Sequence, residues 1–239
     1  MTDIRIAQDT TALAEMAAET IQTLADDAIQ ARGSFTIALS GGSTPKALFI
    51  LLASQYHDTI DWNRVFIFWG DERCVPPDHA DSNYRMARET LLDHVNLPTD
   101  NVFRLKGELP PPEAAEDYER VLHSFFGDEL PRLDLILLGM GDDGHTASLF
   151  PHTEALKETQ RWVVPNYVSA KETWRLTLTA LVINNAANVM FLVAGTEKAE
   201  RLKQVLQGAY QPETLPSQLV KPTNGNLIWG VDQTAAALL

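Results

Sequence analysis

Short, continuously apolar segments that alternate with helical patterns are the feature that most limits what this chain can fold into. The clearest of them span residues 35–39, 65–69, 133–138 and 188–194. An apolar run without polar alternation is typical of a strand covered on both faces, as in a parallel sheet between two layers of helices. The sequence therefore predicts an α/β fold, with a Rossmann-like, mostly parallel sheet flanked by helices on both faces.

The segments between these runs carry the periodicity and the end signals of helices. We expect helices over residues 11–31, 47–53, 113–126 and 197–207, one from Ser82 or Asp81 to about His94, and a small terminal helix. We expect Gly33 and Gly208 to close the first and the last long helix. Further strands are expected over residues 161–167, 175–179 and 226–231, and residues 102–105 form another short apolar run. No repeat or low-complexity segment interrupts the pattern, so we expect residues 1–239 to form a single domain.

Composition places the chain among ordinary globular proteins. Its 239 residues are 45% hydrophobic and 21% charged, which excludes a disordered, collagen-like or coiled-coil chain. The apolar runs are far shorter than a membrane span, and the N-terminal residues show no apolar stretch of a signal peptide. Cys74 is the only cysteine and cannot form an internal disulfide. We therefore expect a cytoplasmic protein with no membrane partner.

Net charge limits the partners further. Nineteen Lys and Arg residues against 32 Asp and Glu residues leave a formal charge of −13 at pH 7. Such a surface repels nucleic acid and anionic lipid, so we expect neither as a partner. It also repels an anionic metabolite, which would bind only where cations and backbone N–H groups are gathered locally. Basic residues beside glycine-rich turns are for that reason the first candidates for a binding site.

The carboxyl ends of parallel strands are where ligands bind in such sheets. The first of these ends leads into S-G-G-S-T-P-K, in which the candidate binding residues are Ser40, Gly41, Gly42, Ser43 and Thr44. Glycines let the backbone come close to a ligand, and the amides at the start of the following helix favour an oxyanion. The alternative is a tight strand-to-helix turn without a ligand. The spacing is neither that of a P-loop nor that of a dinucleotide fingerprint.

Charged residues follow other strand ends. Asp71 and Arg73 come directly after the second apolar run, where Arg73 is placed to hold an anion and Asp71 to position a sugar hydroxyl or act on a proton. Arg175 and Lys198 are the other candidate phosphate ligands. A solvated surface charge is the alternative for each of these residues. Cys74 has no evident base beside it, which argues against a cysteine nucleophile.

The most informative turn is G-M-G-D-D-G-H-T-A-S-L-F-P, residues 139–151, which follows the most apolar strand. Of six histidines, only His145 stands in a glycine-rich turn at a predicted strand end, and a neutral imidazole is a natural general base near neutral pH. Asp143 or Asp142 is placed to fix its tautomer, unless one of them simply caps the next helix. The histidines and acids here match no metal-ligand spacing, so we expect no metal.

Taken together, these motifs resemble the 6-phosphogluconolactonase family, and they stand in that family's order. They are S-G-G-S-T-P at Ser40, G-D-E-R at Gly70 with S-N-Y-R at Ser82, the long His145 motif, R-L-T-L-T at Arg175, and G-x-x-K ending at Lys198. The resemblance covers nearly the whole chain. It implies a Rossmann-like α/β fold, no organic cofactor, and hydrolysis of 6-phospho-D-glucono-1,5-lactone to 6-phosphogluconate in the pentose phosphate pathway of carbohydrate metabolism.

This resemblance leads to an expected metal-free mechanism. His145 takes a proton from water, the water oxygen attacks the lactone carbonyl at C1, and His145 then protonates the leaving ring oxygen. Asp143 and Asp71 are the other candidate catalytic residues. The substrate phosphate is expected to bind the first turn together with the three cations named above. We expect a monomer or a small homo-oligomer.

Two other functions stay open from the sequence. The chain also resembles glucosamine-6-phosphate deaminases, but that family carries an acid five residues after its D-G-H histidine, where this chain has Phe150. It also carries D-E-Y where this chain has Asp71-Glu72-Arg73. Both differences favour the lactonase. The second alternative is a non-catalytic sugar-phosphate sensor, which would need a DNA-binding segment, whereas the α/β pattern occupies the whole chain.

Overall fold

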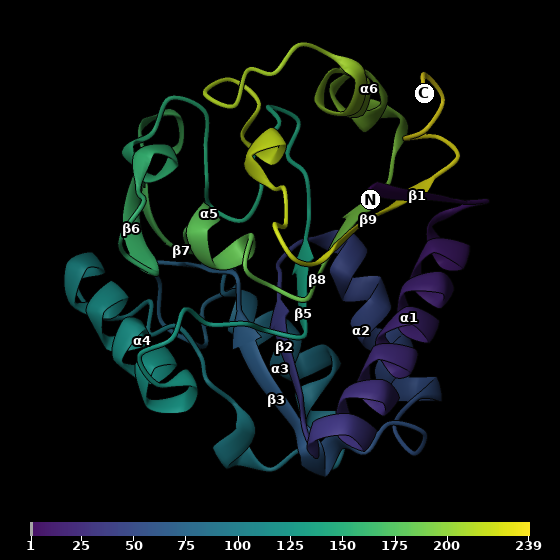
Figure 1. The fold of residues 1–239 in the computed structure, drawn as a ribbon, viewed down its shortest axis with the longest axis vertical. Coiled ribbons are helices and arrows are strands. Elements are labelled where there is room, and N and C mark those ends of the chain that lie inside the picture. The colour runs from purple at the N-terminus through teal and green to yellow at the C-terminus, as the bar shows by residue number, and fades with distance from the viewer. Residues whose placement is uncertain (1) are drawn as a thin grey trace.

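A six-stranded parallel sheet forms the centre of the protein. The computed structural model describes residues 2–239, and the strand order is β1-β9-β8-β5-β2-β3 (Figure 1). The strands are β1 (Thr2–Ala7), β2 (Phe35–Leu39), β3 (Val65–Trp69), β5 (Leu135–Leu138), β8 (Asn188–Val193) and β9 (Asn226–Asp232). All neighbouring pairs run parallel. The predicted α/β class with a mostly parallel sheet is confirmed.

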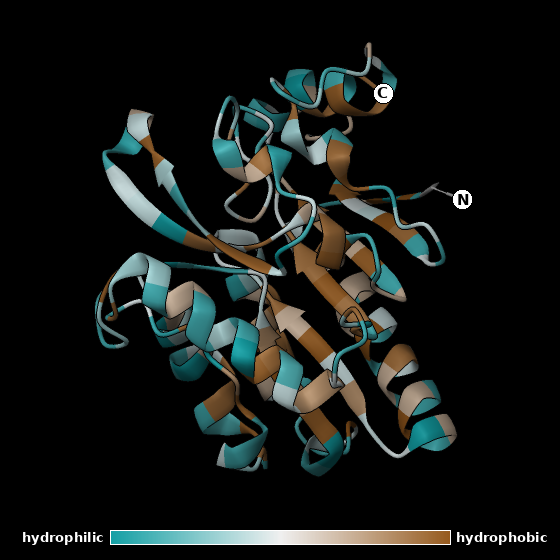
Figure 2. Cartoon of the chain, turned by 60° about the vertical axis from the view of Figure 1, so that its left-hand side comes forward, coloured by the Kyte–Doolittle hydropathy of each residue, from teal (hydrophilic) through white to brown (hydrophobic). Residues whose placement is uncertain are grey.

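Helices cover both faces of this sheet, as predicted. They are α1 (Thr10–Arg32), α2 (Ser43–Gln55), α3 (Asn83–Thr90), α4 (Pro111–Phe126), α5 (Ala180–Ile183) and α6 (Ala199–Gln207). On one face, Ile21 of α1 and Leu52 of α2 surround a small internal void together with Ile67 of β3. On the other face, Phe125 of α4 packs edge-on against Phe68, with ring centroids 5.2 Å apart. Figure 2 shows the strands of the sheet mostly in hydrophobic brown and the helices with hydrophilic teal segments.

Three short strands form a second, antiparallel sheet in the order β4-β7-β6. β4 (Asp71–Arg73) follows β3 after Gly70, whereas β6 (Val163–Val168) and β7 (Thr173–Leu178) form a hairpin. The sequence predicted both hairpin strands but did not separate them from the parallel sheet. Their connection is far too short for the crossover that parallel neighbours require, so they can only pair in opposite directions.

Local capping sets the ends of the long helices. The Asp9 carboxylate accepts the N–H of Ala12 (2.9 Å) at the start of α1, and Gly33 ends this helix with φ +82°. Of the two predicted caps of α3, Ser82 is the one that caps it, through the N–H of Arg85 (3.1 Å). Each expected helix of the chain interior is present, with ends displaced by a few residues.

The sequence predictions were wrong at both ends of the chain. β1 was not predicted, because its two isoleucines alternate with charged residues instead of forming a continuous apolar run. The expected terminal helix is a series of turns at residues 233–238, in which the Asp232 carboxylate accepts the N–H of Ala235 (2.7 Å) and the hydroxyl of Thr234 (2.9 Å). These local bonds compete with helix formation in a segment too short to nucleate one.

Two smaller differences concern single positions. Gly208 ends α6 with an ordinary φ of −79° instead of a left-handed one. The apolar run at residues 102–105 makes one isolated bridge, from Val102 to Ile67, and no strand. No helix among residues 2–239 combines the length and the apolar character that crossing a bilayer requires.

Candidate active site

The carboxyl ends of β2, β3 and β5 meet around a cavity of about 190 Å³. Its lining comes from the three turns that the sequence singled out and from α3: Ser40, Gly41, Gly42, Asp71, Arg73, Asn83, Gly139, Met140, Gly141, His145 and Ala147. Larger hollows lie elsewhere on the described surface. The chemistry of the lining, and not its size, therefore makes this cavity the candidate site.

His145 lines this cavity and is hydrogen-bonded to Asp143 in the same turn. Nδ1 of His145 lies 2.5 Å from Oδ1 of Asp143, and the same oxygen accepts the backbone N–H of His145 at 3.0 Å. Burial opposes ionisation of Asp143, but these hydrogen bonds and the charge of His145 outweigh it and lower its pKa to about 2. An ionised carboxylate only accepts hydrogen bonds, so Nδ1 of His145 donates to it, and in the neutral form of the imidazole Nε2 is the basic nitrogen.

Two neighbours fix the plane of the imidazole. Phe150 stacks on His145 with ring centroids 4.0 Å apart and an angle of 20° between the rings. On the side of Gly141 there is no room for a side chain, because a Cβ atom there would lie 2.0 Å from Nδ1 of His145. The ring is therefore held by packing as well as by its hydrogen bond to Asp143.

A residue from much later in the chain holds the same turn. The carbonyl oxygen of Gly144 accepts hydrogen bonds from both the N–H and the hydroxyl of Ser217, each at 2.9 Å. Ser217 is buried, and Gly144 adopts φ +81°. Sequence reasoning missed Ser217, because its local sequence gives no sign of a contact with a turn 73 positions earlier.

Asp71 is a buried carboxylate in the cavity wall. Its Oδ2 accepts the hydroxyl of Ser148 at 2.7 Å, and its Oδ1 lies 3.4 Å from the amide nitrogen of Asn83. Asn83 also donates to the backbone carbonyl of Asp71 at 3.0 Å. Ser148 and Asn83 lie inside motifs that the sequence analysis quoted, yet it assigned no role to either. Together they hold Asp71 in one orientation at the edge of the cavity.

Glu72, directly after Asp71, supports the site from behind. Its buried carboxylate accepts the N–H groups of Arg73 (2.7 Å), Asn83 (2.7 Å) and Tyr84 (2.8 Å) and the hydroxyl of Ser82 (3.0 Å). Burial raises the pKa of Glu72, and the backbone hydrogen bonds oppose part of that rise. The carboxylate thus ties the start of α3 to β4 and with it positions Asn83.

We expect Glu72→Ala to lower the free energy of unfolding by about 2–4 kcal/mol, because several buried N–H groups lose their acceptor. Glu113→Ala, at an exposed position in the first turn of α4, is the matched control and should change stability by less than about 0.5 kcal/mol. Urea unfolding measures both. Equal stability of the two variants would show that Glu72 does not brace α3.

Arg73 and Arg175 stand opposite each other in the β4–β7 ladder. Arg73 lines the cavity and donates to the carbonyl of Asp81 at 2.6 Å. Burial and the nearby charge of Arg73 lower the pKa of Arg175, and neighbouring acidic groups oppose part of this effect. Like charges directly across a sheet are unfavourable. An anion bound beside Arg73 would relieve this repulsion.

Of the remaining predicted ligands, Ser40 lines the cavity, whereas Ser43, Thr44, Arg175 and Lys198 do not. Lys198 ends the short 3₁₀ turn after β8, and its ammonium pairs with the carboxylate of Asp142 in the His145 turn. Ser43 and Thr44 form the first turn of α2. Ser40 does line the cavity, and its buried hydroxyl has no hydrogen-bond partner among the described residues.

The described residues offer neither a reactive thiol nor a group of metal-ligating side chains beside this cavity. Burial raises the pKa of Cys74 to about 11, so its thiol stays protonated near neutral pH and is a poor nucleophile. Within residues 2–239, no three or more His, Cys, Asp or Glu side chains are gathered as a metal ion would need. The chemistry available at the cavity is therefore that of an oriented imidazole, a buried carboxylate, arginine and glycine-turn amides.

Known proteins share this sequence pattern. The profile of the family described as glucosamine-6-phosphate isomerases/6-phosphogluconolactonase matches residues 8–229. The chain belongs to this family. The resemblance that the motifs suggested is thereby confirmed.

Relatives within this family are similar over nearly their full length. A 6-phosphogluconolactonase of Nostoc sp. is 43% identical over 240 residues, which cover 99% of this chain and 98% of the relative. One of Synechocystis sp. is 44% identical, with coverage of 93% and 92%. The solved structure of 6-phosphogluconolactonase from Trypanosoma cruzi has a TM-score of 0.89 and 30% identity, and the match covers 100% of this chain and 97% of that one.

For this member of the glucosamine-6-phosphate isomerase/6-phosphogluconolactonase family, the depressed pKa of Asp143 predicts how stability depends on pH. A carboxyl with a pKa of about 2 in the folded state and 3.8 when unperturbed stabilises the fold above its unfolded pKa. That contribution is lost as the pH falls through the folded value. Because the Asp143 side chain is 46% exposed, we expect only about 1 kcal/mol at neutral pH.

Asp143→Asn should therefore be about 1 kcal/mol less stable than the parent near pH 7, and the two should become equally stable only below the folded-state pKa, at about pH 1. Unfolding free energies measured between these limits test this. A difference that stays constant throughout the acid range would mean that the charge of Asp143 makes no contribution to stability.

Proposed function

We propose that the chain hydrolyses 6-phospho-D-glucono-1,5-lactone to 6-phospho-D-gluconate, the lactone-opening step of the oxidative pentose phosphate pathway. The substrate is suggested by the relatives at 43% and 44% identity, which are 6-phosphogluconolactonases. The observation that carries the proposal is the imidazole of His145, which lines the cavity and is oriented by an ionised Asp143. The reaction opens a cyclic carboxylic ester with water and needs no organic cofactor.

In the proposed mechanism, His145 is the general base. Its Nε2 takes a proton from water while the water oxygen forms a bond to C1 of the lactone, and the carbonyl π electrons move onto the carbonyl oxygen. A loop amide or a cation at the cavity stabilises this oxyanion. When the intermediate collapses, the bond from C1 to the ring oxygen breaks, and the imidazolium returns its proton to that oxygen. Asp143 stays ionised throughout and stabilises the imidazolium.

The binding roles follow from charge and position. We assign the phosphate to the 40–44 turn together with Arg73, Arg175 and Lys198. The like charges of Arg73 and Arg175 across the ladder support an anion there, and the unpartnered hydroxyl of Ser40 supports a further hydrogen bond to the ligand. Asp71, held by its own hydrogen bonds, is assigned to a sugar hydroxyl.

The setting of the reaction is part of the proposal. The residues assigned to the site extend from the turn after β2 to the turn after β8, so we propose that residues 1–239 act as a single domain. A single cysteine and the anionic, phosphorylated substrate support a cytoplasmic enzyme.

The alternative activity is that of a glucosamine-6-phosphate deaminase. One residue of the site, Phe150, argues against it. The stacking partner of His145 is Phe150, which offers no carboxyl group to assist the opening of an amino-sugar ring. Two assays separate the activities. Freshly generated 6-phosphogluconolactone, corrected for spontaneous hydrolysis, should be consumed much faster with the enzyme than without it, and glucosamine 6-phosphate should release no ammonia. The opposite pair of results would make the chain a deaminase.

Removal of metal should leave the lactonase activity unchanged. We expect the same rate after exhaustive chelation and assay in metal-free buffer, since an oriented imidazole is a sufficient base for this reaction. If chelation abolished the activity and only a divalent ion restored it, the attacking water would be activated by a metal ion and not by the imidazole of His145.

A further inference from the structure

β1, one of the two outer strands of the parallel sheet, has an edge that pairs with no other strand among the described residues. β1 stands at one end of the strand order, and among the described residues it pairs with β9 alone. Figure 1 shows it at the margin of the ribbon. An edge of this kind offers a row of N–H and C=O groups to another strand, and proteins usually protect such rows with charge or a bulge.

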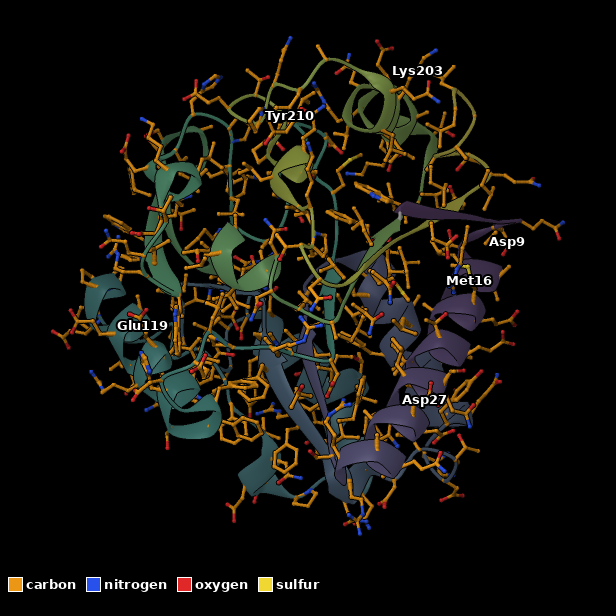
Figure 3. The ribbon with its side chains drawn as sticks, in the orientation of Figure 1. Asp9, Met16, Asp27, Glu119, Lys203 and Tyr210 are labelled. Carbon is orange, nitrogen blue, oxygen red and sulfur yellow. The ribbon has the colours of Figure 1, made fainter. Side chains whose placement is uncertain are left out.

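The two faces of β1 differ in chemistry. Ile4 and Ile6 are 44% and 57% exposed, and Ile4 lines a groove of about 360 Å³ together with Tyr210 and Trp229. Tyr210, labelled in Figure 3, is also exposed, so apolar surface continues inward from the strand. The opposite face carries Asp3 and Arg5, both of which line a separate hollow beside α1.

The charges of β1 are complementary to themselves. In an antiparallel pair of two identical strands, a register that places Ile4 opposite Ile4 also places Asp3 opposite Arg5 and Arg5 opposite Asp3. A shift by two residues in one direction would put Asp3 opposite Asp3, and in the other direction Arg5 opposite Arg5. Opposite charges directly across a sheet are favourable and like charges are not. The sequence of this strand therefore selects one register and, instead of protecting the edge, favours pairing with a copy of itself.

We propose that two copies of this chain associate through β1, antiparallel and centred on Ile4. Such a dimer has two-fold symmetry about an axis normal to the sheet, and every contact occurs twice. The two Ile4 side chains meet on one face, and the exposed apolar surface around Ile4 and Ile6 is covered. On the other face, Asp3 of each copy meets the partner's Arg5.

The charged side chains are already oriented for this contact. Nε of Arg5 donates to Oδ2 of Asp3 at 2.7 Å, and another guanidinium nitrogen donates to the hydroxyl of Thr20 on α1 at 3.0 Å. Thr20 thus restrains Arg5 on the correct face, which reduces the side-chain entropy lost on association. The guanidinium and the carboxylate each have further hydrogen-bonding capacity, so the two pairs can join into a four-membered network across the symmetry axis.

A charge-swap experiment tests this interface. Sedimentation equilibrium from roughly 1 μM to 1 mM covers the range in which small interfaces dissociate, and it should show the wild-type chain in a monomer–dimer equilibrium. Asp3→Arg alone and Arg5→Asp alone should each weaken the dimer by about tenfold or more, because both cross-strand pairs then carry like charges. Glu154→Arg, which makes the same change of charge as Asp3→Arg at an exposed position outside β1, is the control and should have the wild-type dimer affinity.

Two combinations make the test specific for register. The double variant Asp3→Arg/Arg5→Asp should dimerise again, since the charges are merely exchanged. An equimolar mixture of the two single variants should form a heterodimer, because one chain then carries two positive and the other two negative charges at the interface. Far-UV circular dichroism and lactonase activity should be the same in all variants, and association is measured independently of whether the proposed reaction occurs.

Three results would overturn the proposal. The first is a wild-type chain that stays monomeric over the whole range. The second is a dimer that neither single variant weakens. The third is that both single variants dimerise weakly and their equimolar mixture forms no heterodimer. That result would mean that the charges act within one chain and not between two.

Discussion

Replacing His145 with alanine is expected to lower kcat by about 10²-fold or more, the usual effect of losing a general base. KM should change little, because the imidazole acts on water and not on the phosphate. Steady-state kinetics with freshly generated 6-phosphogluconolactone measures both constants after subtraction of the spontaneous rate. The stacking of Phe150 and the absence of space at Gly141 make His145 part of a rigid turn, so the variant's fold must be checked separately.

His145→Asn serves that purpose, because it retains a polar side chain of similar reach but cannot act as a base near neutral pH. It should lose as much kcat as the alanine variant while unfolding at nearly the wild-type denaturant concentration. His57→Ala, at a half-exposed position on another part of the chain, should leave kcat unchanged. Near-wild-type turnover by either His145 variant would remove the imidazole from the mechanism.

The second large effect is expected at Arg73. If its guanidinium holds the substrate phosphate in the cavity, Arg73→Ala should lower kcat/KM for the phosphorylated lactone by an amount equivalent to roughly 2–5 kcal/mol, the cost of removing one partner of a buried charge pair. That is a loss of about 30-fold to several thousand-fold. Arg120→Ala, an exposed arginine on α4, is the control for the change in net charge.

The substrate's phosphate makes this prediction specific. Arg73→Ala should hardly affect the slow hydrolysis of unphosphorylated gluconolactone. The same comparison applies to Lys198→Ala, whose ammonium pairs with Asp142 in the absence of substrate. Equal losses for both lactones in a variant would assign that cation to the lactone chemistry or to the fold, and the phosphate assignment would then be wrong.

The position of the site could be predicted from the sequence because of one rule of topology. Parallel strands end at the same edge of a sheet, so Ser40, Asp71 and His145 were selected as the residues that follow three apolar runs. The structure brings these residues to one cavity. This prediction needs no knowledge of contacts between the three residues. Continuous apolar runs indicate buried parallel strands, and the carboxyl ends of parallel strands lie at one edge of the sheet.

The supporting contacts could not be predicted in this way. Ser217 reaches the His145 turn across 73 positions, and Ser148 reaches Asp71 across 77. Such pairs depend on how loops pack in three dimensions, and a serine in a loop has no periodicity that would reveal its partner. β1 was missed because its isoleucines alternate with charged residues and it lacks the continuous apolar character of the other strands of the parallel sheet.

The strand order has a consequence for how the protein is made. Among the described residues β9 is the last strand in chain order, and it lies between β8 and the first strand, β1. β1 therefore has no partner in the sheet until β9 has been synthesised, and it joins the sheet only after this later strand is in position. Ser217 comes late as well, so the turn that holds His145 is completed at the same stage. A chain without β9 would leave β1 unpaired and one edge of β8 exposed, and such exposed strands are prone to associate with other chains.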